Sequence, residues 1–421
     1  MKSKKFIILI LAAFILRLLL IPIAFHGDLN NNISWGKLAS ERGLANFYEG
    51  TDWPNSAPNQ PPLTILLFAF TNNIWSFVDN SSWFLNNRIS FFPSKFIWYW
   101  ERQGMTLLVK LPSVLADLGI GWLIYKYFKE KKMERRGFIL SALWLFNPVI
   151  LYNSAVWGQT DPIVNLLGLV SILFLMKRKL VLSMIFIVLS LLFKGSLSIF
   201  LPILFVVMIW QKYEVKEWVR AFAACAICVV GISIWFHPAF DLPVWLFNLY
   251  NQRIFPGEIG YLTANAFNFW WIVDPGKVLD SYIYFGLSAH IWGYLLVIGI
   301  VLTLILWLKK HKFEEKYIFY ALSLTALATF LFFTRIHERY LYPFFPLATI
   351  SLGFFPEILI SYIILSILSL LNLYHLFWAP PFSFLESLLK IDSVKTALSI
   401  INLIVFIKLI HLTKKINSLI N

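Results

Sequence analysis

The chain has 421 residues, of which 59% are hydrophobic, 18% are aromatic and only 14% are charged. A soluble globular protein carries about 25% charged residues, so this composition excludes one large soluble core and indicates an integral membrane protein. The net charge of +14 sits mainly in short basic tracts between apolar runs, where it orients helices relative to the cytoplasm and gives no reason to expect a nucleic-acid partner.

The apolar runs are too long for the short alternating strands of a membrane barrel, so we expect an all-α protein. The first run, 6–25, is too long for a signal peptide and lacks a small-residue cleavage site, which predicts a retained membrane helix. Cytoplasmic ends are expected at the basic tracts Lys2–Lys5, Lys126–Arg136, Lys177–Lys179, Lys212–Arg220, Lys309–Lys316 and Lys414–Lys415.

About twelve transmembrane helices with both termini inside would place all of these tracts on the cytoplasmic side. They are expected to form one polytopic membrane domain over 1–421, without a separate soluble domain. The only two cysteines, Cys225 and Cys228, lie inside one apolar run, which favours packing over redox or metal chemistry. The expected spans are 6–25, 106–128, 138–153, 161–176, 180–194, 196–211, 218–236, 285–308, 317–333, 341–356, 358–377 and 396–413.

Two long external loops are expected, at 26–105 and at 237–284. Within the first loop, residues 61–78 are nearly apolar enough to span, but a span there would place the tract 126–136 on the wrong side of the membrane. The apolar part is only about ten residues long, which is typical of an interfacial or re-entrant helix. The first loop is therefore expected to contain membrane-hugging helices.

Unusual polar residues gather at the external ends of the predicted helices, which indicates an external cavity for a polar group. Asp28 follows the first span and lies beside His26. Its carboxylate could serve as a general base that takes a proton from an attacking hydroxyl, or could simply solvate a loop. Asp161, after Gln159, heads a helix; capping of that helix and an active-site role are both open.

Lys194 lies between two apolar runs and is expected to need an anionic partner. His337, Glu338 and Arg339 precede another apolar run and are either an interfacial anchor or part of the site. Together with Lys194, His337 and Arg339 offer donors suited to a phosphate group.

Two further ionisable residues, Arg17 and Asp117, fall in mid-helix in the first and second spans. Charges inside a membrane are costly unless they are paired. We therefore expect these two residues to form a structural pair.

Seven segments, in order and reaching to about residue 345, resemble the GT-C superfamily of membrane glycosyltransferases. The likeness is greatest to prokaryotic mannosyltransferase-like proteins related to the second GPI-anchor mannosyltransferase. The segments are HGD, QPPLT, KLPSVLADL, NPVILYNSAVWGQTDP, FKGSLSIFLP, ANAFNFW and HERYLYP.

The resemblance implies an inverting hexosyltransferase, with mannose favoured, that uses a polyprenyl-phosphate sugar donor and a lipid-linked, glycan or protein acceptor on the external face. It implies Asp28 as general base, with Asp161 as a second catalytic candidate. Position 30 is Asn where many relatives have a second acid, so no cofactor is expected; a divalent metal ion is compatible with the resemblance but is not supported by a paired-acid motif. The implied substrate-binding residues are His26, Gln159, Lys194, Asn265, His337, Glu338 and Arg339.

Other functions compatible with a basic, aromatic external cavity are a lipid-linked glycan polymerase or ligase and a flippase-type transporter. Transporters often have two related halves, and no internal repeat is visible here. The abundance of Lys, Ile and Asn suggests an AT-rich prokaryote, and hence the plasma membrane with the site facing outside, although a eukaryotic reticulum membrane is also compatible.

Overall fold

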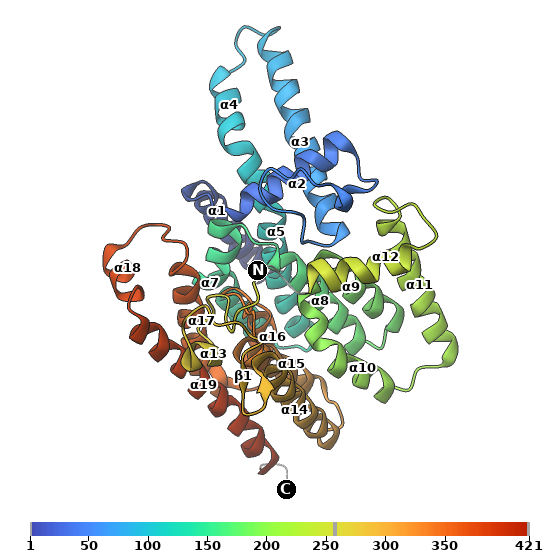
Figure 1. Ribbon diagram of the computed structural model, residues 1–421, viewed down its shortest axis with the longest axis vertical. Helices are drawn as coiled ribbons and strands as arrows, with labels where there is room; N and C mark the ends of the chain where they lie inside the picture. The colour runs from blue at the N-terminus through green and yellow to red at the C-terminus, as the bar shows by residue number, and fades with distance from the viewer. Residues whose placement is uncertain (1, 256–258, 419–421) are drawn as a thin grey trace.

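The computed structural model describes residues 2–255 and 259–418, and these residues are almost entirely helical (Figure 1). The expectation of an all-α fold is confirmed. The second predicted external loop, 237–284, includes residues 256–258, which lie outside the described residues. The one sheet in the described ranges is a hairpin of β1 (Ile283–Tyr284) and β2 (Leu287–Ser288), paired antiparallel.

The helical segments follow one another with short connections, and π-helical or 3-10 turns (η) interrupt several of them. The segments before residue 200 are α1 (Lys2–Leu20), η1 (Ile21–Ile23), α2 (Asp28–Arg42), η2 (Phe47–Glu49), α3 (Pro62–Asn86), α4 (Ser94–Tyr99), η3 (Trp100–Gly104), α5 (Met105–Glu130), α6 (Glu134–Leu145), α7 (Pro148–Leu151), η4 (Tyr152–Trp157), α8 (Asp161–Met176), α9 (Leu180–Phe193) and η5 (Gly195–Phe200). The remaining segments are α10 (Leu201–Trp210), α11 (Val215–Ser233), α12 (Leu242–Leu249), η6 (Tyr250–Ile254), α13 (Phe269–Val273), α14 (Ala289–Lys310), α15 (Glu315–Phe332), α16 (Phe344–Leu352), η7 (Pro356–Ile358), α17 (Leu359–Tyr374), α18 (Ser383–Leu389) and α19 (Asp392–Ser418).

Each predicted span overlaps a helix, but the prediction of about twelve membrane spans is not confirmed. Five helices in the described residues are long and apolar enough to cross a membrane, and the α6–α7 segment, bent by 49°, would be a sixth. Several apolar runs include turns, so their helices are shorter than the roughly 20 residues that a straight span needs. The five are Lys4–Ile23, Ser94–Glu130, Ala289–Lys310, Pro356–Tyr374 and Asp392–Ile416.

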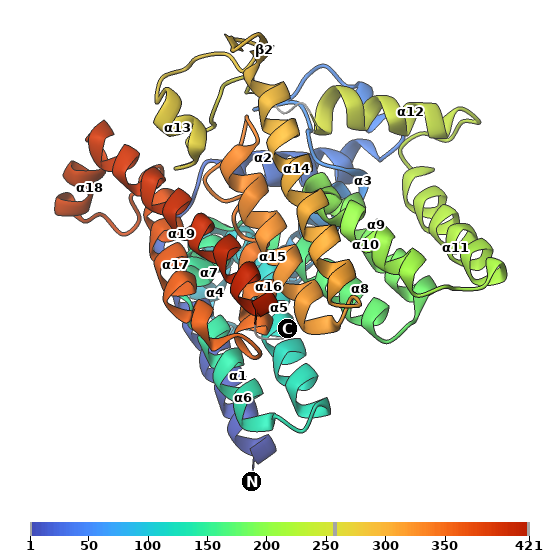
Figure 2. The ribbon, with the colours of Figure 1, turned by 90° about the horizontal axis from the view of Figure 1, so that it is seen from below.

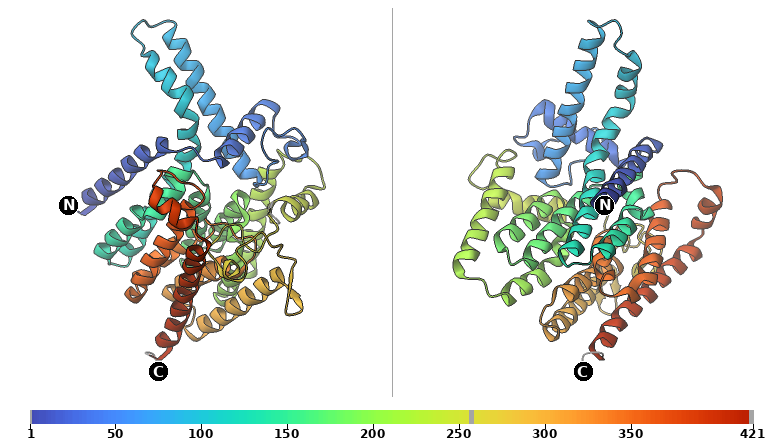
Figure 3. Two further views of the ribbon diagram at one scale, coloured as in Figure 1. Left: turned by 60° about the vertical axis from the view of Figure 1, so that its left-hand side comes forward. Right: turned by 180° about the vertical axis from the view of Figure 1, so that it is seen from behind.

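The segment that the topology excluded as a span, 61–78, forms most of α3, a helix of 25 residues. This helix is longer than the expected ten apolar residues, and it is not among the described helices that pass as membrane spans. It pairs with α4 in a hairpin that projects from the body of the molecule (Figure 3). Large side chains such as Phe77 and Phe91, 72% and 88% exposed, cover its surface.

Basic residues from three separate tracts meet at one end of the bundle. Lys131, Arg178, Lys312 and Lys316 line one pocket, and Glu130 bridges to Lys177 at 2.6 Å. This arrangement is the one expected for cytoplasmic connections. In Figure 2, α2, α12, α13 and the β1–β2 hairpin gather at the opposite end from the α5–α6 connection.

The two buried charges in α1 and α5 form the expected pair. Arg17 Nε lies 3.3 Å from Asp117 Oδ2, and both side chains are fully buried. Tyr342, from the connection between α15 and α16, donates a hydrogen bond of 2.5 Å to Asp117 Oδ1. Since a buried ion pair needs further hydrogen bonds to offset desolvation, Tyr342 ties the connection that carries Arg339 to the first two spans.

Candidate functional site

Asp28 is the first residue of α2, and its carboxylate is held on one side only. Oδ2 accepts hydrogen bonds from Gln159 Nε2 at 2.6 Å and Trp157 Nε1 at 3.2 Å. The backbone N–H of Asp28 donates to His26 Nδ1 at 3.0 Å. Oδ1 accepts no hydrogen bond from the described residues, and the side chain is 42% exposed. The carboxylate is therefore oriented and still has an oxygen open to a ligand.

Lys110, which the sequence analysis did not select, fixes the two segments that meet at Asp28. Its Nζ donates to the carbonyl oxygens of Ile21, Ala24 and Val156 at 3.0, 2.7 and 2.7 Å. The side chain is fully buried, and three main-chain acceptors use the three donors of an ammonium group. The only sequence signal was its place at the start of the segment KLPSVLADL.

Gly158 gives the turn that brings Gln159 to Asp28. Its φ of +91° is strained for any residue with a side chain. A Cβ there would lie 2.9 Å from Leu29 Cδ2 and 3.0 Å from Lys110 Cγ. The turn therefore depends on glycine for both its conformation and its space.

We expect Gly158→Ala to lower the free energy of unfolding by about 2–4 kcal/mol, from left-handed strain and overpacking together. The measurement is the thermal unfolding midpoint in detergent micelles. Gly27→Ala is the matched control, because Gly27 has a helical φ of −56° and a Cβ there would meet nothing within 4 Å. Equal midpoints for the two variants would contradict this account of the turn.

Lys194 has the anionic partner that its position predicted. The residue follows the end of α9, and its Nζ lies 2.7 Å from Asp161 Oδ1 at the start of α8, with side chains 11% and 5% exposed. Oδ2 of Asp161 is buried and has no partner in the described residues. Asp161 thus holds the ammonium group of Lys194 and keeps one oxygen unused.

Glu338 and Arg339 form the second ion pair of this site, in the connection between α15 and α16. Arg339 Nη1 lies 2.6 Å from Glu338 Oε1, and His337 Nδ1 lies 3.8 Å from Glu338 Oε2. Burial alone would raise the pKa of Glu338, but the Arg339 guanidinium and His337 outweigh it and lower that pKa to about 2. The carboxylate is therefore charged at neutral pH.

The two ion pairs and Asp28 belong to one cluster. Burial lowers the pKa of Arg339, but the charges of Glu338, Tyr340, Asp28 and Asp161 reverse that effect and raise it. Nε of Arg339 is buried without a partner in the described residues. Residues that are distant in the chain are thus close enough to act on one guanidinium.

The contacts of Asn265 with the segment that carries His337 and with Asn372 are made by its main chain. It has a positive φ of +68° and forms a bridge to His337, while the neighbouring Ala264 N–H donates to the carbonyl of Ile336 at 3.0 Å. The carbonyl of Asn265 accepts a hydrogen bond from Asn372 Nδ2 at 2.8 Å. These contacts hold the segment 263–271 against the segment that carries His337.

Aromatic rings that the sequence analysis did not select line the same end of the bundle. His26 lies 4.3 Å from the Trp157 ring and 4.7 Å from the Phe377 ring, measured between centroids. The Tyr340 ring lies 5.1 Å from Lys194 Nζ. Aromatic side chains beside charged groups are common where a protein binds ligands with both apolar and polar parts.

We expect the protein to lose stability in acid. Burial lowers the pKa of both His26 and His337 below 6.5. As pH falls below about 6.5, the unfolded chain therefore takes up protons before the folded chain does, and the free energy of unfolding decreases. Glu338 adds a further loss between its ordinary value of 4.5 and about 2.

The measurement is the thermal unfolding midpoint between about pH 7.5 and about pH 5.5. His337→Gln should reduce its pH dependence, whereas the same change at His411, exposed on α19, should not. A variant with the pH dependence of the unaltered chain would exclude His337 as a source.

Carboxylates and cations nearly balance in the cluster: Asp28, Asp161 and Glu338 face Lys194 and Arg339. The described residues contain no group of three or more His, Cys, Asp or Glu side chains arranged to hold a metal ion. A phosphate group would have to share the two cations with their present partners.

Comparison with known proteins assigns the family. The model of the PIG-U family, described as GPI transamidase subunit PIG-U, matches residues 43–273, more than half of the chain. No curated protein gave a significant match. The matched range includes Gln159, Asp161, Lys194 and Asn265, whereas Asp28 precedes it and Arg339 follows it.

This match links the chain to GPI-anchor processing in a membrane, and it names a subunit of a transamidase and not a mannosyltransferase. The specific relation to GT-C mannosyltransferases is therefore not confirmed. The chain is a multi-pass membrane protein that belongs to the PIG-U family.

Proposed function

We propose that the protein transfers a hexose, with mannose favoured, from a polyprenyl-phosphate donor to a lipid-linked, glycan or protein acceptor, with inversion at the anomeric carbon. The observation that carries the proposal is the open oxygen of Asp28, whose carboxylate is oriented by Gln159 and Trp157 and acts electrostatically on Arg339. The reaction would take place on the extracytoplasmic face, opposite the basic pocket, in a prokaryotic plasma membrane.

Asp28 would act as the general base. The acceptor hydroxyl attacks the anomeric carbon, its proton passes to Asp28 Oδ1, and the bond from that carbon to the phosphate oxygen breaks. The electron pair of the broken bond stays on the departing phosphate. A positioned base of this kind contributes on the order of 10²–10⁴-fold to a rate.

Lys194 and Arg339 would stabilise the departing phosphate. Each uses one N–H on its carboxylate partner, and an ammonium group has three donors and a guanidinium five. Preorganised cations stabilise the charge that develops in the transition state more than the ground state. Asp161 would position the ammonium group of Lys194 for the phosphate. His337 would act indirectly, through the carboxylate of Glu338 that binds Arg339.

A second function is favoured by the family match: a non-catalytic subunit that binds a lipid-linked glycan within a GPI-anchor-processing complex. The same cations would hold the phosphate, and Asp28 would accept a hydrogen bond from a sugar hydroxyl. In that case protein partners would supply the chemistry. The two functions differ in whether the isolated chain transfers sugar.

The deciding experiment supplies the purified chain with radiolabelled polyprenyl-phosphate mannose or glucose and a membrane extract as acceptor. Movement of label into the extract, dependent on the chain, is the expected result. Saturable binding of the labelled lipid without any transfer would support the binding subunit and overturn the transferase.

A further inference from the structure

A pocket of 490 Å³ lies between the α5–α6, α8–α9 and α14–α15 connections, at the opposite end of the bundle from α2 (Figure 2). Its volume is within the roughly 300–1,000 Å³ typical of ligand pockets. Lys131 follows α5, Arg178 follows α8 and Lys312 follows α14, and all three line the pocket. Lys316, in the first turn of α15, is a fourth lining cation. The apolar lining includes Met176, Trp210, Phe313 and Phe354.

The cations of the pocket exceed its carboxylates by two. The lining carboxylates are Glu314 and Glu315, against four lining cations. Lys131 Nζ lies 2.6 Å from Glu315 Oε2, and Lys316 Nζ lies 3.3 Å from Glu314 Oε2. These two ion pairs leave the charges of Arg178 and Lys312 without a compensating carboxylate among the lining residues.

The two excess cations are available to a ligand. Arg178 Nη2 donates to the carbonyl oxygen of Gln211 at 2.5 Å, and its guanidinium lies 5.8 Å from the centroid of the Tyr213 ring. These contacts hold the guanidinium in place but do not neutralise it, and a guanidinium has further donors. The exposed side chain of Lys312 forms no hydrogen bond or ion pair with the described residues.

The pocket lies at the level where membrane spans end. The candidate span Ser94–Glu130 ends one residue before Lys131, and the candidate span Ala289–Lys310 ends two residues before Lys312. The Trp210 ring, 44% exposed, lies 4.9 Å from the Phe313 ring, and tryptophan is enriched at membrane interfaces. The cations are therefore placed at the depth of phospholipid head groups.

An apolar surface leads from the pocket into the membrane. Helices α10 and α14 are in contact, and α10 ends at Trp210, which lines the pocket. Their exposed residues include Phe205 and Ile209 on α10 and Leu302 and Leu306 on α14, each more than half exposed. Hydrocarbon chains of a lipid whose head lay in the pocket would cover these faces.

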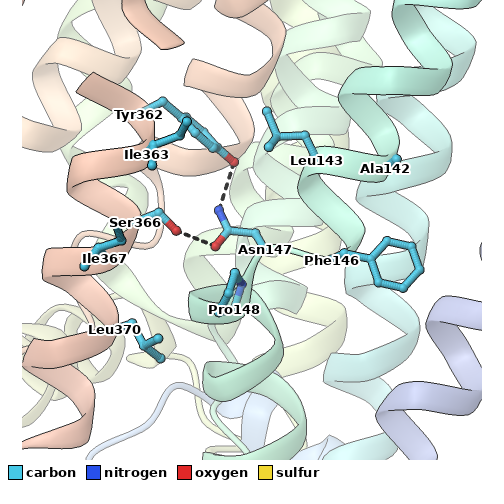
Figure 4. Close-up of a pocket in the computed structure, with 10 residues that line it drawn as sticks. All are labelled: Ala142, Leu143, Phe146, Asn147, Pro148, Tyr362, Ile363, Ser366, Ile367 and Leu370. Atoms are coloured by element: carbon cyan, nitrogen blue, oxygen red, sulfur yellow. Dashed lines mark hydrogen bonds between the residues drawn. The ribbon is translucent and has the colours of Figure 1, made fainter. Parts of the chain in front are cut away.

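The groove between the α6–α7 segment and α17 has no such charge excess. Its lining residues are uncharged, and its polar groups are paired: Asn147 Nδ2 donates to Tyr362 Oη at 3.1 Å, and Ser366 Oγ donates to Asn147 Oδ1 at 2.5 Å (Figure 4). That groove does not distinguish one apolar occupant from another, whereas the basic pocket favours an anion.

We propose that the basic pocket binds the phosphate of an anionic phospholipid in the leaflet opposite the Asp28 site, with Arg178 and Lys312 as its principal contacts. Basic pockets between membrane helices on the cytoplasmic side bind anionic head groups, and arginine and lysine both bind phosphate. One bound lipid would join the three connections that form the pocket and stabilise the folded chain by mass action. The proposal does not depend on sugar transfer.

The first test uses the unaltered chain in a nonionic detergent, with the thermal unfolding midpoint as the readout. Added phosphatidylglycerol is expected to raise the midpoint in a saturable way. Phosphatidylcholine, which has no net charge, and glycerol phosphate, which has no acyl chains, are expected to leave it unchanged. Equal stabilisation by phosphatidylcholine would assign the effect to bulk lipid, and equal stabilisation by glycerol phosphate would assign the pocket to a free phosphate; either result contradicts the proposal.

The second test compares Lys312→Gln with Lys310→Gln. Both variants remove one exposed lysine charge from the same tract, but Lys310 is not among the residues that line the pocket. The phosphatidylglycerol concentration for half-maximal stabilisation is expected to rise about fivefold in Lys312→Gln, the effect of one cation at the membrane surface, and clearly less in Lys310→Gln. Equal changes in the two variants would mean that the lipid senses the general surface charge, and no change in either would exclude the pocket. Because Lys312 Nζ has no partner in the described residues, the midpoints without lipid should agree.

Discussion

Replacement of Asp28 with asparagine is expected to lower the transfer rate by about 10²–10⁴-fold while leaving the fold and donor binding intact. The amide keeps the size of the carboxylate but cannot take the proton of the acceptor. Gln159 and Trp157 bind only Oδ2, so an asparagine oxygen can keep both hydrogen bonds. The measurements are turnover of a radiolabelled donor and thermal stabilisation by the same donor.

Asp52→Asn is the control, because Asp52 is an exposed acid of the same external loop, 71% accessible and paired with Arg42. It should retain full turnover. If Asp28→Asn also retains turnover, Asp28 is not the base. If the unaltered chain binds the donor but never turns it over, the proposed non-catalytic binding subunit is the better account.

Removal of Lys194 is expected to have the largest effect on stability. Lys194→Met leaves the carboxylate of Asp161 buried without its partner, which should cost about 3–5 kcal/mol of unfolding free energy. The double variant Lys194→Met with Asp161→Leu removes both charges. Because well-packed apolar residues often replace a buried ion pair without loss, the double variant should regain most of that stability.

Activity separates the structural role of this pair from its functional role. The double variant should be folded and yet unable to transfer, since the phosphate has lost one of its two cations. Turnover is measured alongside the unfolding midpoint. A stable double variant with normal turnover would show that Lys194 serves only the fold, and would leave Arg339 as the single cation of the site.

The sequence predicted that Lys194 needs an anionic partner and that Arg17 pairs with Asp117, and both pairs are present, whereas the predicted number of spans is not confirmed. Ionisable groups are costly in lipid, so Lys194 was expected to need an anionic partner, and Asp161 is that partner. Asp28 and Arg339 were expected at the external ends of helices, and Asp28 is the first residue of α2. Hydropathy, however, counts apolar residues in any conformation. The run 341–356 includes a turn, and only Phe344–Leu352 is helical.

The contacts within the cluster could not be predicted from local patterns. Gln159 reaches Asp28 because η4 is π-helical and Gly158 has a left-handed φ, and π-helical turns have no dependable sequence signature. Nothing in the sequence distinguishes Lys110 from other cations near the end of a span. Its partners are main-chain carbonyl oxygens, which every residue has, so the sequence cannot identify them.

The way in which Lys110 binds has a consequence for how this protein could acquire new specificities. Its ammonium group contacts only peptide oxygens of Ile21, Ala24 and Val156, so these three hydrogen bonds do not depend on which side chains stand at those positions. A carboxylate to amide exchange at position 28 would then convert a transferring protein into one that only holds its lipid, with no redesign of the surrounding backbone.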